Sequence, residues 1–436
     1  MSNDIVQINV SQQVGATSST LQQTGACISN GATTLAEGTT ALITQTSDLT
    51  PLLVAPQALT SLTWLSSVVT GTTTTPHGYT TGQSIYLTIA GAAPAGYNGT
   101  FLASITGAST FTYPLTTNPG TETTPGTVIS GSVAELTSMI DTFFANGSTV
   151  SVNVLEVGAV SSTVGIANFD TWLTANLNKI YLALLPRSWA ADSTLLPLGK
   201  LYSSTTSKFY MLTTCSMADY AEYAATKCFV TAVEAAGVAT PPSTEFDLAS
   251  FMWNVLNQNP STTNKVPPMA FRFVSGVTGS NFTGPQQSAL KAGFCNYFIT
   301  GAEGGISNII TKWGTTADGR DFTYWYAVDW LQINIALALS NEIINGSNNP
   351  INPLGYNQNG INRLQLRAQQ TTNSGITYAL ILSPATVQAV PFAQYVVDNP
   401  NDYLEGIYNG FSLVMTPQIG FKSITFNISV TDFITS

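Results

Sequence analysis

The feature that most constrains the fold of this chain is a change of hydrophobic period close to residue 131. Apolar residues from Val133 to Phe144 recur at every third or fourth position and the segment ends in Asn146-Gly147, which predicts a helix. The strands expected beyond it are VSVNVLEVG, KIYLALLPR, KFYMLTT, CFVTAV and PMAFRFVSGV, and the expected helices are IANFDTWLTANL, MADYAEYAA and EFDLASFMWNVLNQ. Strands that alternate with helices indicate an α/β layer with parallel strands.

The segment before this change has a different composition. From about Thr63 to Gly131 the chain is rich in Thr, Gly, Ala and Pro, and its short apolar runs are separated by turn sequences such as PHG and PAGYNG. We expect a small all-β barrel or sandwich over 63–130. Because the α/β pattern begins only after it, this domain is interpreted as an insertion on an exposed loop.

The C-terminal part of the chain mixes both patterns. The run YWYAVDWLQINIALALS, residues 324–340, carries Asp329, Gln332 and Asn334. It is too short and too polar for a membrane span, which needs ~20 apolar residues, so it predicts a long buried helix. Further helices are expected near 353–368 and 400–408, and further strands in GITYALIL, GFSLVMTP and SITFNISV.

Both ends of the chain alternate between apolar and polar residues, which is the period of a strand with one buried face. The apolar residues of these segments, DIVQINV and SITFNISV, are Ile5, Val6, Ile8, Val10, Ile424, Phe426, Ile428 and Val430. Chain ends usually fray, whereas a strand needs a partner for its backbone donors and acceptors. The sequence therefore predicts two terminal strand arms, paired either within the same molecule or with a neighbouring copy.

Charged residues make up 8% of the chain, against a usual share of ~25%. A freely diffusing protein generally keeps a mixed charged surface, so we expect neighbours to cover much of this one. No Lys or Arg precedes Lys179, whereas eight acidic residues do, and the net charge is -10. Proteins that track phosphates need clustered Lys and Arg. Nucleic acid is therefore not an expected partner.

Residue types that usually carry catalysis or bind metals are scarce. His77, the only histidine, lies between Pro and Gly and is interpreted as a turn residue. GAEGGIS at Gly301 lacks the lysine of a phosphate loop, and ADGRDF, with Asp318 and Asp321, lacks the ligand spacing of a calcium loop. Both are interpreted as turns, and the aromatic cluster YWYAVDW as core. We predict no catalytic residue, no cofactor and no metal site.

The four cysteines are interpreted as reduced thiols in or near the core. Cys27, Cys215, Cys228 and Cys295 have neither a C-x-x-C spacing nor a histidine companion, which argues against zinc. The start MSNDIVQINV has no basic residue and no apolar run, so no secretory signal is expected. Synthesis in a reducing cytosol follows from this interpretation.

The C-terminal third of the chain, from NSGITYALILSPATVQAV through GFSLVMTPQIGFKSITFNISVTDF, resembles the tail-sheath subunits of contractile-tailed bacteriophages. SVAELTSMIDTFFANGSTVSVNVLEVG and the α/β run after it are similar to the same family. The resemblance covers most of the chain outside 63–130, and that module itself is similar to a small β module of phage virion proteins, where it usually decorates the outside.

The resemblance implies a non-enzymatic, multidomain α/β (α+β) subunit, in keeping with the two to four domains that 436 residues predict. The implied parts are an N-terminal linker arm (1–18), an α/β sheath body (19–62 and 131–330), the inserted, surface-exposed β domain (63–130), a C-terminal sheath core domain (331–421) and a C-terminal strand arm (422–436).

The resemblance also implies how such a subunit works. Copies stack as helical rings around a tail tube, and each sends its terminal arms to neighbours, where they complete a small sheet by strand addition. Contraction of this metastable polymer drives the tube through the host envelope during genome delivery. The implied partners are other copies, the tail tube protein, and baseplate and neck or tail-terminator proteins, without membrane insertion. The implied location is the virion tail, after assembly in the host cytoplasm.

Two other classes of protein remain open. A β-rich cell-surface or adhesin-like protein fits the Thr-rich segments and the low charge, but it needs an export route. A glycan-degrading enzyme needs only two carboxylates, and the chain has 23 Asp and Glu, although nothing in the sequence singles out a pair. For a sheath subunit, the acid-only stretch before Lys179 adds the expectation that this part faces away from the tube.

Overall fold

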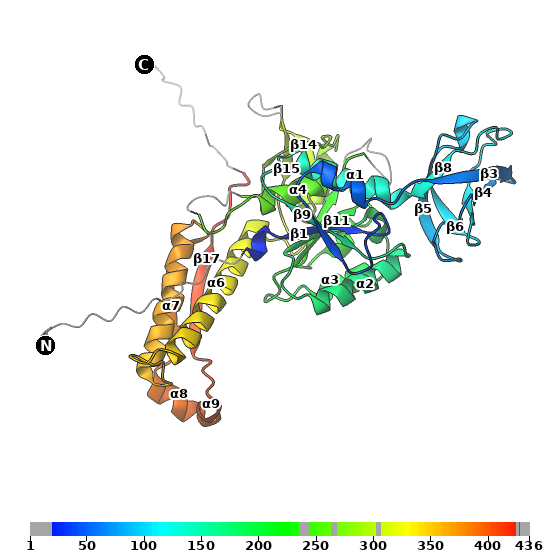
Figure 1. The fold of residues 1–436 in the computed structure, drawn as a ribbon. Helices are drawn as coiled ribbons and strands as arrows, with labels where there is room; N and C mark the ends of the chain where they lie inside the picture. The colour runs from blue at the N-terminus through cyan, green and yellow to red at the C-terminus, as the bar shows by residue number, and fades with distance from the viewer. Residues whose placement is uncertain (1–19, 235–243, 263–267, 302–306, 424–426, 428–436) are drawn as a thin grey trace, which may run out of the picture. The chain divides into compact units, whose positions relative to one another are not determined.

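The computed structural model describes residues 20–234, 244–262, 268–301, 307–423 and 427 (Figure 1). The chain divides into two compact units. The larger consists of 21–258, 267–323 and 419–436, and the smaller of 1–20, 259–266 and 324–418.

A six-stranded sheet forms the centre of the larger unit, in the order β12-β11-β10-β1-β9-β2. Its strands are β1 (Gly25–Ser29), β2 (Thr40–Ile43), β9 (Val152–Glu156), β10 (Leu182–Leu184), β11 (Tyr210–Cys215) and β12 (Phe229–Val233). All neighbouring pairs are parallel except β2 with β9. The predicted α/β layer with parallel strands is confirmed.

Helices pack on both faces of this sheet (Figure 1). On one face, α2 (Ser162–Ala175) and α3 (Leu195–Leu201) contribute Phe169, Trp172 and Leu198 to a core that includes Ile28 and Met211 of the strands. On the other face, α1 (Gly131–Phe144) packs against α4 (Asp247–Leu256). α1 contacts β1, and α4 contacts β10 and β11. Two covered faces account for the near-continuous apolar strands.

Two predicted elements of this unit are wrong. MADYAEYAA forms only a short 3-10 turn, Tyr220–Tyr223, because Ala225 takes a positive φ of 65° and ends the run. PMAFRFVSGV keeps only two strand residues, β13 (Phe273–Val274), since Phe271 has φ 62°. β13 pairs antiparallel with β15 (Ile309–Lys312), which pairs with β14 (Tyr297–Thr300). The helix α5 (Gly284–Ala292) precedes β14.

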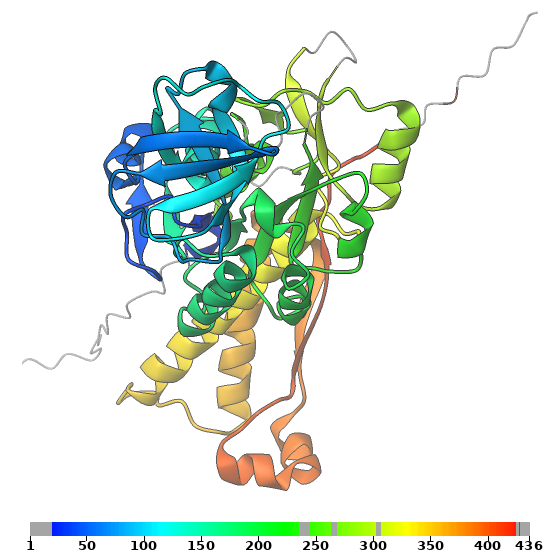
Figure 2. The ribbon, with the colours of Figure 1, turned by 90° about the vertical axis from the view of Figure 1, so that its right-hand side faces the viewer.

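A closed β-barrel precedes α1 (Figure 2, blue and cyan). Its strands run in the order β3-β4-β7-β6-β5-β8. They are β3 (Gln57–Leu65), β4 (Val68–Thr73), β5 (Ser84–Ala90), β6 (Gly99–Ile105), β7 (Thr110–Pro114) and β8 (Thr127–Ser130). Val69, Leu87 and Phe111 fill its interior, and a Cβ on Gly71 would lie 2.3 Å from the Phe111 ring, so glycine is required there. The barrel begins before Thr63 and belongs to the larger unit; an inserted separate domain over 63–130 stays a prediction.

The smaller unit combines helices with a hairpin. Its elements are α6 (Phe322–Ser347), whose first two residues belong to the larger unit, α7 (Gln358–Thr377), β16 (Ile381–Ala389), α8 (Phe392–Asp398), α9 (Pro400–Glu405) and β17 (Phe411–Pro417). The predicted long helix is confirmed, but only its first third is largely buried. No helix among the described residues is long and apolar enough to cross a membrane.

The helix expected near 353–368 starts later and runs further. The Asn357 side chain accepts a hydrogen bond from the Gly360 N–H at 3.0 Å and so caps the first turn of α7. The helix continues to Thr377, past the start of the predicted strand GITYALIL, and Ala379 with φ 59° then turns the chain into β16. The strand GFSLVMTP and a helix beginning at Pro400 are confirmed, whereas α8 was not predicted.

A buried ion pair joins the two long helices. The Glu342 side chain on α6, 7% exposed, accepts hydrogen bonds from Arg363 Nη2 and Arg367 Nε on α7, both at 2.7 Å. Burial alone would raise the pKa of Glu342, but its hydrogen bonds and charge contacts with the two arginines outweigh burial and hold the pKa below its ordinary value.

We expect Gly199→Ala to destabilise the sheet more than Gly284→Ala. A Cβ on Gly199 of α3 would lie 1.9 Å from Phe229 Cε2, whereas a Cβ on Gly284 of α5 meets nothing within 4 Å. Overpacking should lower the free energy of unfolding by about 1–3 kcal/mol for Gly199→Ala, against less than about 0.5 kcal/mol for the control. Urea titration followed by tryptophan fluorescence measures both; equal midpoints would contradict this packing.

We expect Glu342→Gln to loosen the helix pair in a pH-dependent way. A lowered carboxyl pKa stabilises the fold above the unfolded-state pKa of about 4.3, and this stability is lost as the pH falls through the folded-state pKa. The variant should therefore be less stable by roughly 1 kcal/mol at pH 7, and the difference should fade in acid. Hydrogen exchange of α6 and α7 peptides measures it, with the exposed Glu405→Gln as control.

Candidate functional site

Side chains that could support chemistry are dispersed through the structure. No group of three or more His, Cys, Asp or Glu side chains able to hold a metal occurs among the described residues. The buried His77 ring stacks on Tyr79, with centroids 5.1 Å apart, and its Nδ1 accepts the Tyr79 N–H at 3.2 Å. His77 therefore stabilises its own loop, as the turn interpretation predicts.

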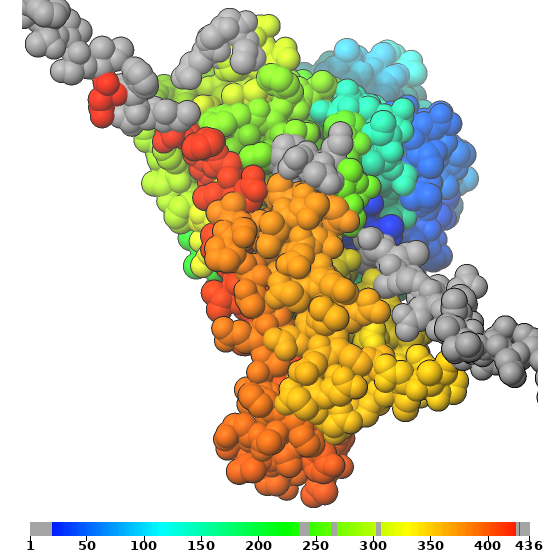
Figure 3. Space-filling model, turned by 90° about the vertical axis from the view of Figure 1, so that its left-hand side faces the viewer, coloured from blue at the N-terminus to red at the C-terminus, as the bar shows by residue number. Residues whose placement is uncertain are grey.

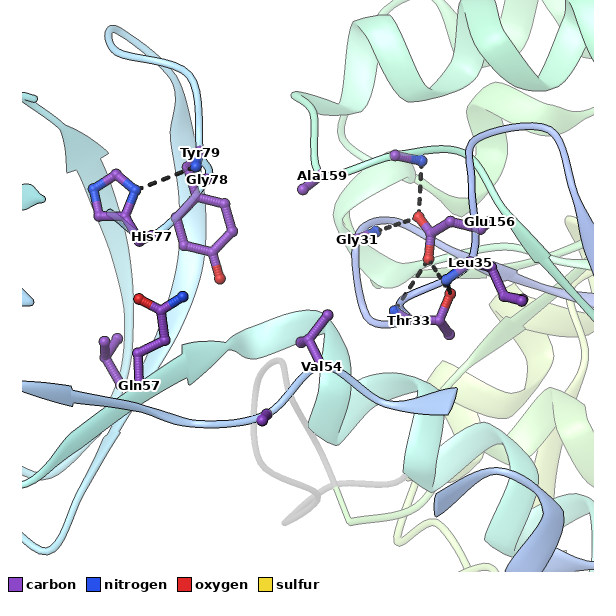
Figure 4. A pocket seen from close by; sticks show the side chains of 13 residues that line it. Gly31, Thr33, Leu35, Val54, Gln57, His77, Gly78, Tyr79, Glu156 and Ala159 are labelled. Carbon is purple, nitrogen blue, oxygen red and sulfur yellow. Dashed lines mark hydrogen bonds between the residues drawn. The ribbon is translucent and has the colours of Figure 1, made fainter. Parts of the chain in front are cut away.

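Glu156, a carboxylate only 1% exposed at the end of β9, holds two loops together (Figure 4). Its oxygens accept from Ser29 Oγ at 2.6 Å, Gly31 N at 2.7 Å, Thr33 N at 3.1 Å, Thr33 Oγ1 at 2.7 Å and Gly158 N at 2.8 Å. It borders a hollow of about 210 Å³ that His77 and Tyr79 also line. Because five donors already hold both oxygens, Glu156 is a structural acceptor that fixes the loops after β1 and β9.

A second group of buried charges surrounds Arg187. Its Nε donates to the Glu234 carboxylate at 2.8 and 2.9 Å, its guanidinium lies 4.0 Å from the Phe246 ring centroid, and its backbone N–H donates to Glu135 Oε1 at 2.7 Å. Burial raises the pKa of Glu135 although the Arg187 charge opposes the shift. These two acids share one guanidinium, which is the arrangement of a structural ion cluster.

The other sequence candidates also have structural roles. Trp325, Tyr326 and Trp330 are buried, which confirms the core interpretation of YWYAVDW. Asp318 accepts from Thr316 Oγ1 at 2.6 Å within the turn before α6, and Lys422 Nζ lies 2.5 Å from Asp321 Oδ1. Most of GAEGGIS lies outside the described residues. All four cysteines are free, with Cys215 and Cys295 sulfurs 3.4 Å apart; Cys215 is half-buried and the other three are buried.

The smaller unit contains a two-stranded sheet formed by β16 and β17. These strands belong to the orange-to-red part of the chain, which Figure 3 shows at the molecular surface. The strands pair antiparallel, with Val387 opposite Leu413 and Thr386 opposite Val414. β16 packs on α7. An isolated two-stranded hairpin is marginal in water, so the state of its two outer edges decides what this sheet can bind.

The outer edge of β16 is occupied by glutamines of α7. The Val387 N–H donates to Gln369 Oε1 at 2.8 Å, and Gln365 Nε2 donates to the Val387 carbonyl at 2.9 Å. Gln369 Nε2 also donates to the Ala385 carbonyl at 3.1 Å. Alternate residues of an antiparallel strand turn both backbone groups away from the partner strand. The two glutamines satisfy the outward groups at Val387 and thereby close this edge to a further strand.

The outer edge of β17 is open within the part of the chain that the structure describes. By the same alternation, Leu413 opposite Val387 turns its N–H and C=O away from β16. No described strand lies on that side. The Val414 side chain is 83% exposed, so the outer face of β17 is also uncovered. Exposed strand edges are templates for another strand, and β17 is therefore the candidate binding site.

The eight predicted arm residues, Ile5, Val6, Ile8, Val10, Ile424, Phe426, Ile428 and Val430, lie outside the described residues. The structure does give the anchor of the C-terminal segment. Lys422, bound to Asp321, belongs to the larger unit, whereas β17 belongs to the smaller one. The alternation of apolar residues predicted β17, but nothing in the sequence predicted that its outer edge is open to a further strand. The sequence signal for the closed β16 edge is a pair of glutamines four residues apart on α7, and such pairs are common on exposed helices.

Comparison with known proteins identifies the fold. No protein-family model and no curated protein matches the chain. A chain of the anti-feeding prophage baseplate superposes with a TM-score of 0.55 at 11% identity, over 98% of this chain and 98% of that one. A chain of the contracted helical sheath of the same prophage gives 0.53 at 10% identity, over 98% and 99%. A sheath tail protein from Listeria innocua gives 0.47 at 10% identity, over 90% and 92%. The two higher scores show that this chain has the fold of a contractile-sheath subunit.

We expect Gln369→Ala to expose the β16 edge selectively. Without the amide, the Val387 N–H loses its acceptor, so its hydrogen exchange should accelerate by about tenfold, as the loss of a hydrogen bond worth about 1–1.5 kcal/mol predicts. Gln370→Ala removes an exposed neighbour that contacts only Arg367 through its side chain and serves as the control. Equal exchange at Val387 in both variants would contradict the capping role of Gln369.

Proposed function

We propose that this chain is the structural subunit of a contractile tail sheath, which polymerises around a tail tube and contracts to drive that tube through a host envelope during genome delivery. The observation that carries the proposal is the sheath-subunit fold, matched over 98% of the chain, together with a two-stranded sheet that has one open edge among the described residues. An open strand edge is a template for pairing with another chain, and a monomer generally protects it.

The terminal arms are the proposed occupants of the β17 edge. Main-chain hydrogen bonds give a strand-addition contact its affinity, and side-chain alternation fixes its register. The alternating segment SITFNISV carries its apolar residues on one face, as an added strand beside half-buried Leu413 requires. The opposite edge is held by Gln365 and Gln369, so arms add on the β17 side only.

Pairing between copies is favoured over pairing within one copy. The chain leaves the smaller unit after Gln418, and Lys422 is bound to Asp321 of the larger unit. The C-terminal arm thus starts from a different unit than the one that carries the open edge. A contact that joins different surfaces of identical copies generates a ring when the rotation between copies closes and an open helical polymer when it does not, and a sheath needs the second case.

A mesh of exchanged strands suits a sheath that changes shape. Each copy keeps its neighbours through backbone hydrogen bonds while rigid bodies rotate, so the polymer can pass from a metastable extended state to a contracted one without dissolving. The energy is stored in the assembly, and no nucleotide is consumed. The partners in this role are other copies, the tube, and baseplate and neck or terminator proteins. The polymer is part of the virion tail and is assembled in the host cytoplasm.

The uneven distribution of charge along the chain favours one orientation of the subunit relative to the tube. All bases lie from Lys179 onward, so the segment that includes the barrel carries acids only. We place this segment away from the tube, on the premise that the tube surface is acidic, because like charges facing each other at an interface are unfavourable.

Removing either arm should abolish assembly without unfolding the protein. We expect the full chain to form hollow striated tubes in negative-stain electron microscopy, and chains lacking 1–11 or 423–436 to stay folded and give no tubes. The strands lost belong to contacts between copies, so near-UV circular dichroism should be unchanged. Normal tubes from either truncated chain would refute strand exchange, and a full chain that never forms tubes would refute the sheath role.

The open edge gives a second measurement in the same experiment. The Leu413 amide should exchange quickly in the unassembled truncated chain and be protected in tubes of the full chain. Val387, already bonded to Gln369, serves as the internal control because its protection should change little. Fast exchange at Leu413 in assembled tubes would place the arms elsewhere.

A further inference from the structure

The helices α8 and α9, drawn in orange in Figure 2, carry exposed apolar side chains among acidic residues. Val397 is 76% and Leu404 82% exposed, and Tyr403 and Ile407 are exposed by 43% and 41%. Isolated exposed apolar residues are normal, but a gathering of them on one short helix pair marks an interaction site. We call α8, α9 and the turn to Ile407 the tip.

The acids of the tip have no basic partner within the described part of the chain. They are Asp398, Asp402 and Glu405. Asp402 accepts from Tyr395 Oη at 2.5 Å and Asn409 Nδ2 at 3.4 Å, and Asp398 accepts from Gln394 Nε2 at 2.8 Å. Glu405 is exposed. The tip therefore offers carboxylates and apolar side chains together, and its complement must be both basic and apolar.

The larger unit has a surface of that kind at the amino edge of its parallel sheet. Lys179 precedes β10, and Lys208 directly precedes Phe209 and β11. Because β10 and β11 are parallel neighbours, their amino ends meet at one edge and bring the two lysines to the same side. Lys200, in the last turn of α3, precedes Leu201 and Tyr202 of the same surface.

A hollow lies at this edge. Its volume is about 130 Å³, and its lining includes Leu177, Asn178, Tyr202, Lys208 and Phe209. Leu177 and Leu201 beside it are 69% and 68% exposed. Asp170, the acid of this region, accepts the Tyr202 hydroxyl at 3.0 Å. We call this surface, with Lys179, Lys200 and Lys208, the basic edge.

We propose that the tip of one copy docks on the basic edge of a second copy, with Leu404 or Val397 seated against Leu177 and Leu201 and the tip carboxylates paired with Lys179, Lys200 and Lys208. The two surfaces are complementary in charge sign, and both expose large apolar side chains beside their charges. The inference rests on the proposed self-assembly and adds a second contact, made by folded surfaces and independent of the arms.

This contact has a physical role distinct from strand exchange. Strand addition gains its affinity from backbone hydrogen bonds, which tolerate many sequences. It therefore fixes the register of the added strand but does little to fix the orientation of one copy relative to the next. A contact between different folded surfaces of identical copies sets the rotation from one copy to the next, and this rotation decides whether the copies close into a ring or continue as a helix. Its ion pairs lie at a protein surface and weaken with salt, so the contact can be broken while the arms hold.

A charge swap in the full chain tests the pairing. Lys179→Glu/Lys200→Glu alone and Asp398→Lys/Glu405→Lys alone place like charges opposite each other, and each should cut pelletable assembly at least tenfold. The chain carrying all four changes restores opposite signs with an unchanged net charge and should recover at least half of it. The control for the four-site chain, Lys291→Glu/Glu37→Lys, reverses two exposed charges elsewhere, also without changing the net charge, and should assemble as the original chain does. Normal assembly of both two-site variants, or no recovery by a folded four-site variant, would overturn the proposal.

Cross-linking of the unaltered chain keeps the test independent of variant folding. A zero-length carbodiimide applied to mixed light and heavy-isotope copies should join Lys179, Lys200 or Lys208 to Asp398, Asp402 or Glu405 in peptides of mixed isotope. These lysines joined only to other acids would refute the contact, and so would links confined to a tube protein when one is added. Absence of tubes contradicts the proposed function, whereas the cross-links report on the contact in concentrated protein either way.

Discussion

The proposed strand addition depends on two hydrogen bonds between glutamines of α7 and the backbone of Val387. A two-stranded sheet has two outer edges, and both are alike in backbone chemistry. By occupying one edge with its own side chains, the chain leaves a single acceptor edge at β17 and so gives strand addition a direction. Without this asymmetry an added strand could pair on either side, and identical copies would join in more than one geometry.

The larger unit supplies the rigidity that such a mesh needs. β1 lies between β9 and β10 with helices on both faces, and Glu156 ties the end of β1 and the loop after it to the end of β9 with four hydrogen bonds. α4 also packs closely on the sheet at Gly25, where a Cβ would lie 2.3 Å from Met252 Cε. In the proposed sheath, a body packed in this way would move as a block, and changes of shape would fall to the links between copies.

Sequence patterns predicted the elements whose periodicity is local and failed where tertiary contacts decided. The parallel strands and α1, α2, α4 and α6 follow from apolar spacing. The central strand β1 does not, because GACIS is short and rich in small residues, and only burial on both faces makes it a strand. MADYAEYAA has helical spacing, yet the positive φ of Ala225 ends it. The acceptor edge could not be predicted, since it depends on Gln365 and Gln369 meeting a strand that follows α7 in the chain.

The positions of the lysines in the fold show how a chain with few charged residues can still form a basic surface. With few charges in total, each lysine that is not paired internally weighs more in deciding which surfaces can meet. Lys179 and Lys208 come to one edge because the strands they precede are parallel neighbours, so the topology of the sheet, rather than a run in the sequence, creates the basic surface. A composition without a phosphate-tracking stripe can therefore still supply the proposed directional contact. Where the rest of the surface is neutral and rich in Thr and Gly, few competing ion pairs can form, so a few complementary charges would suffice to set the register between copies.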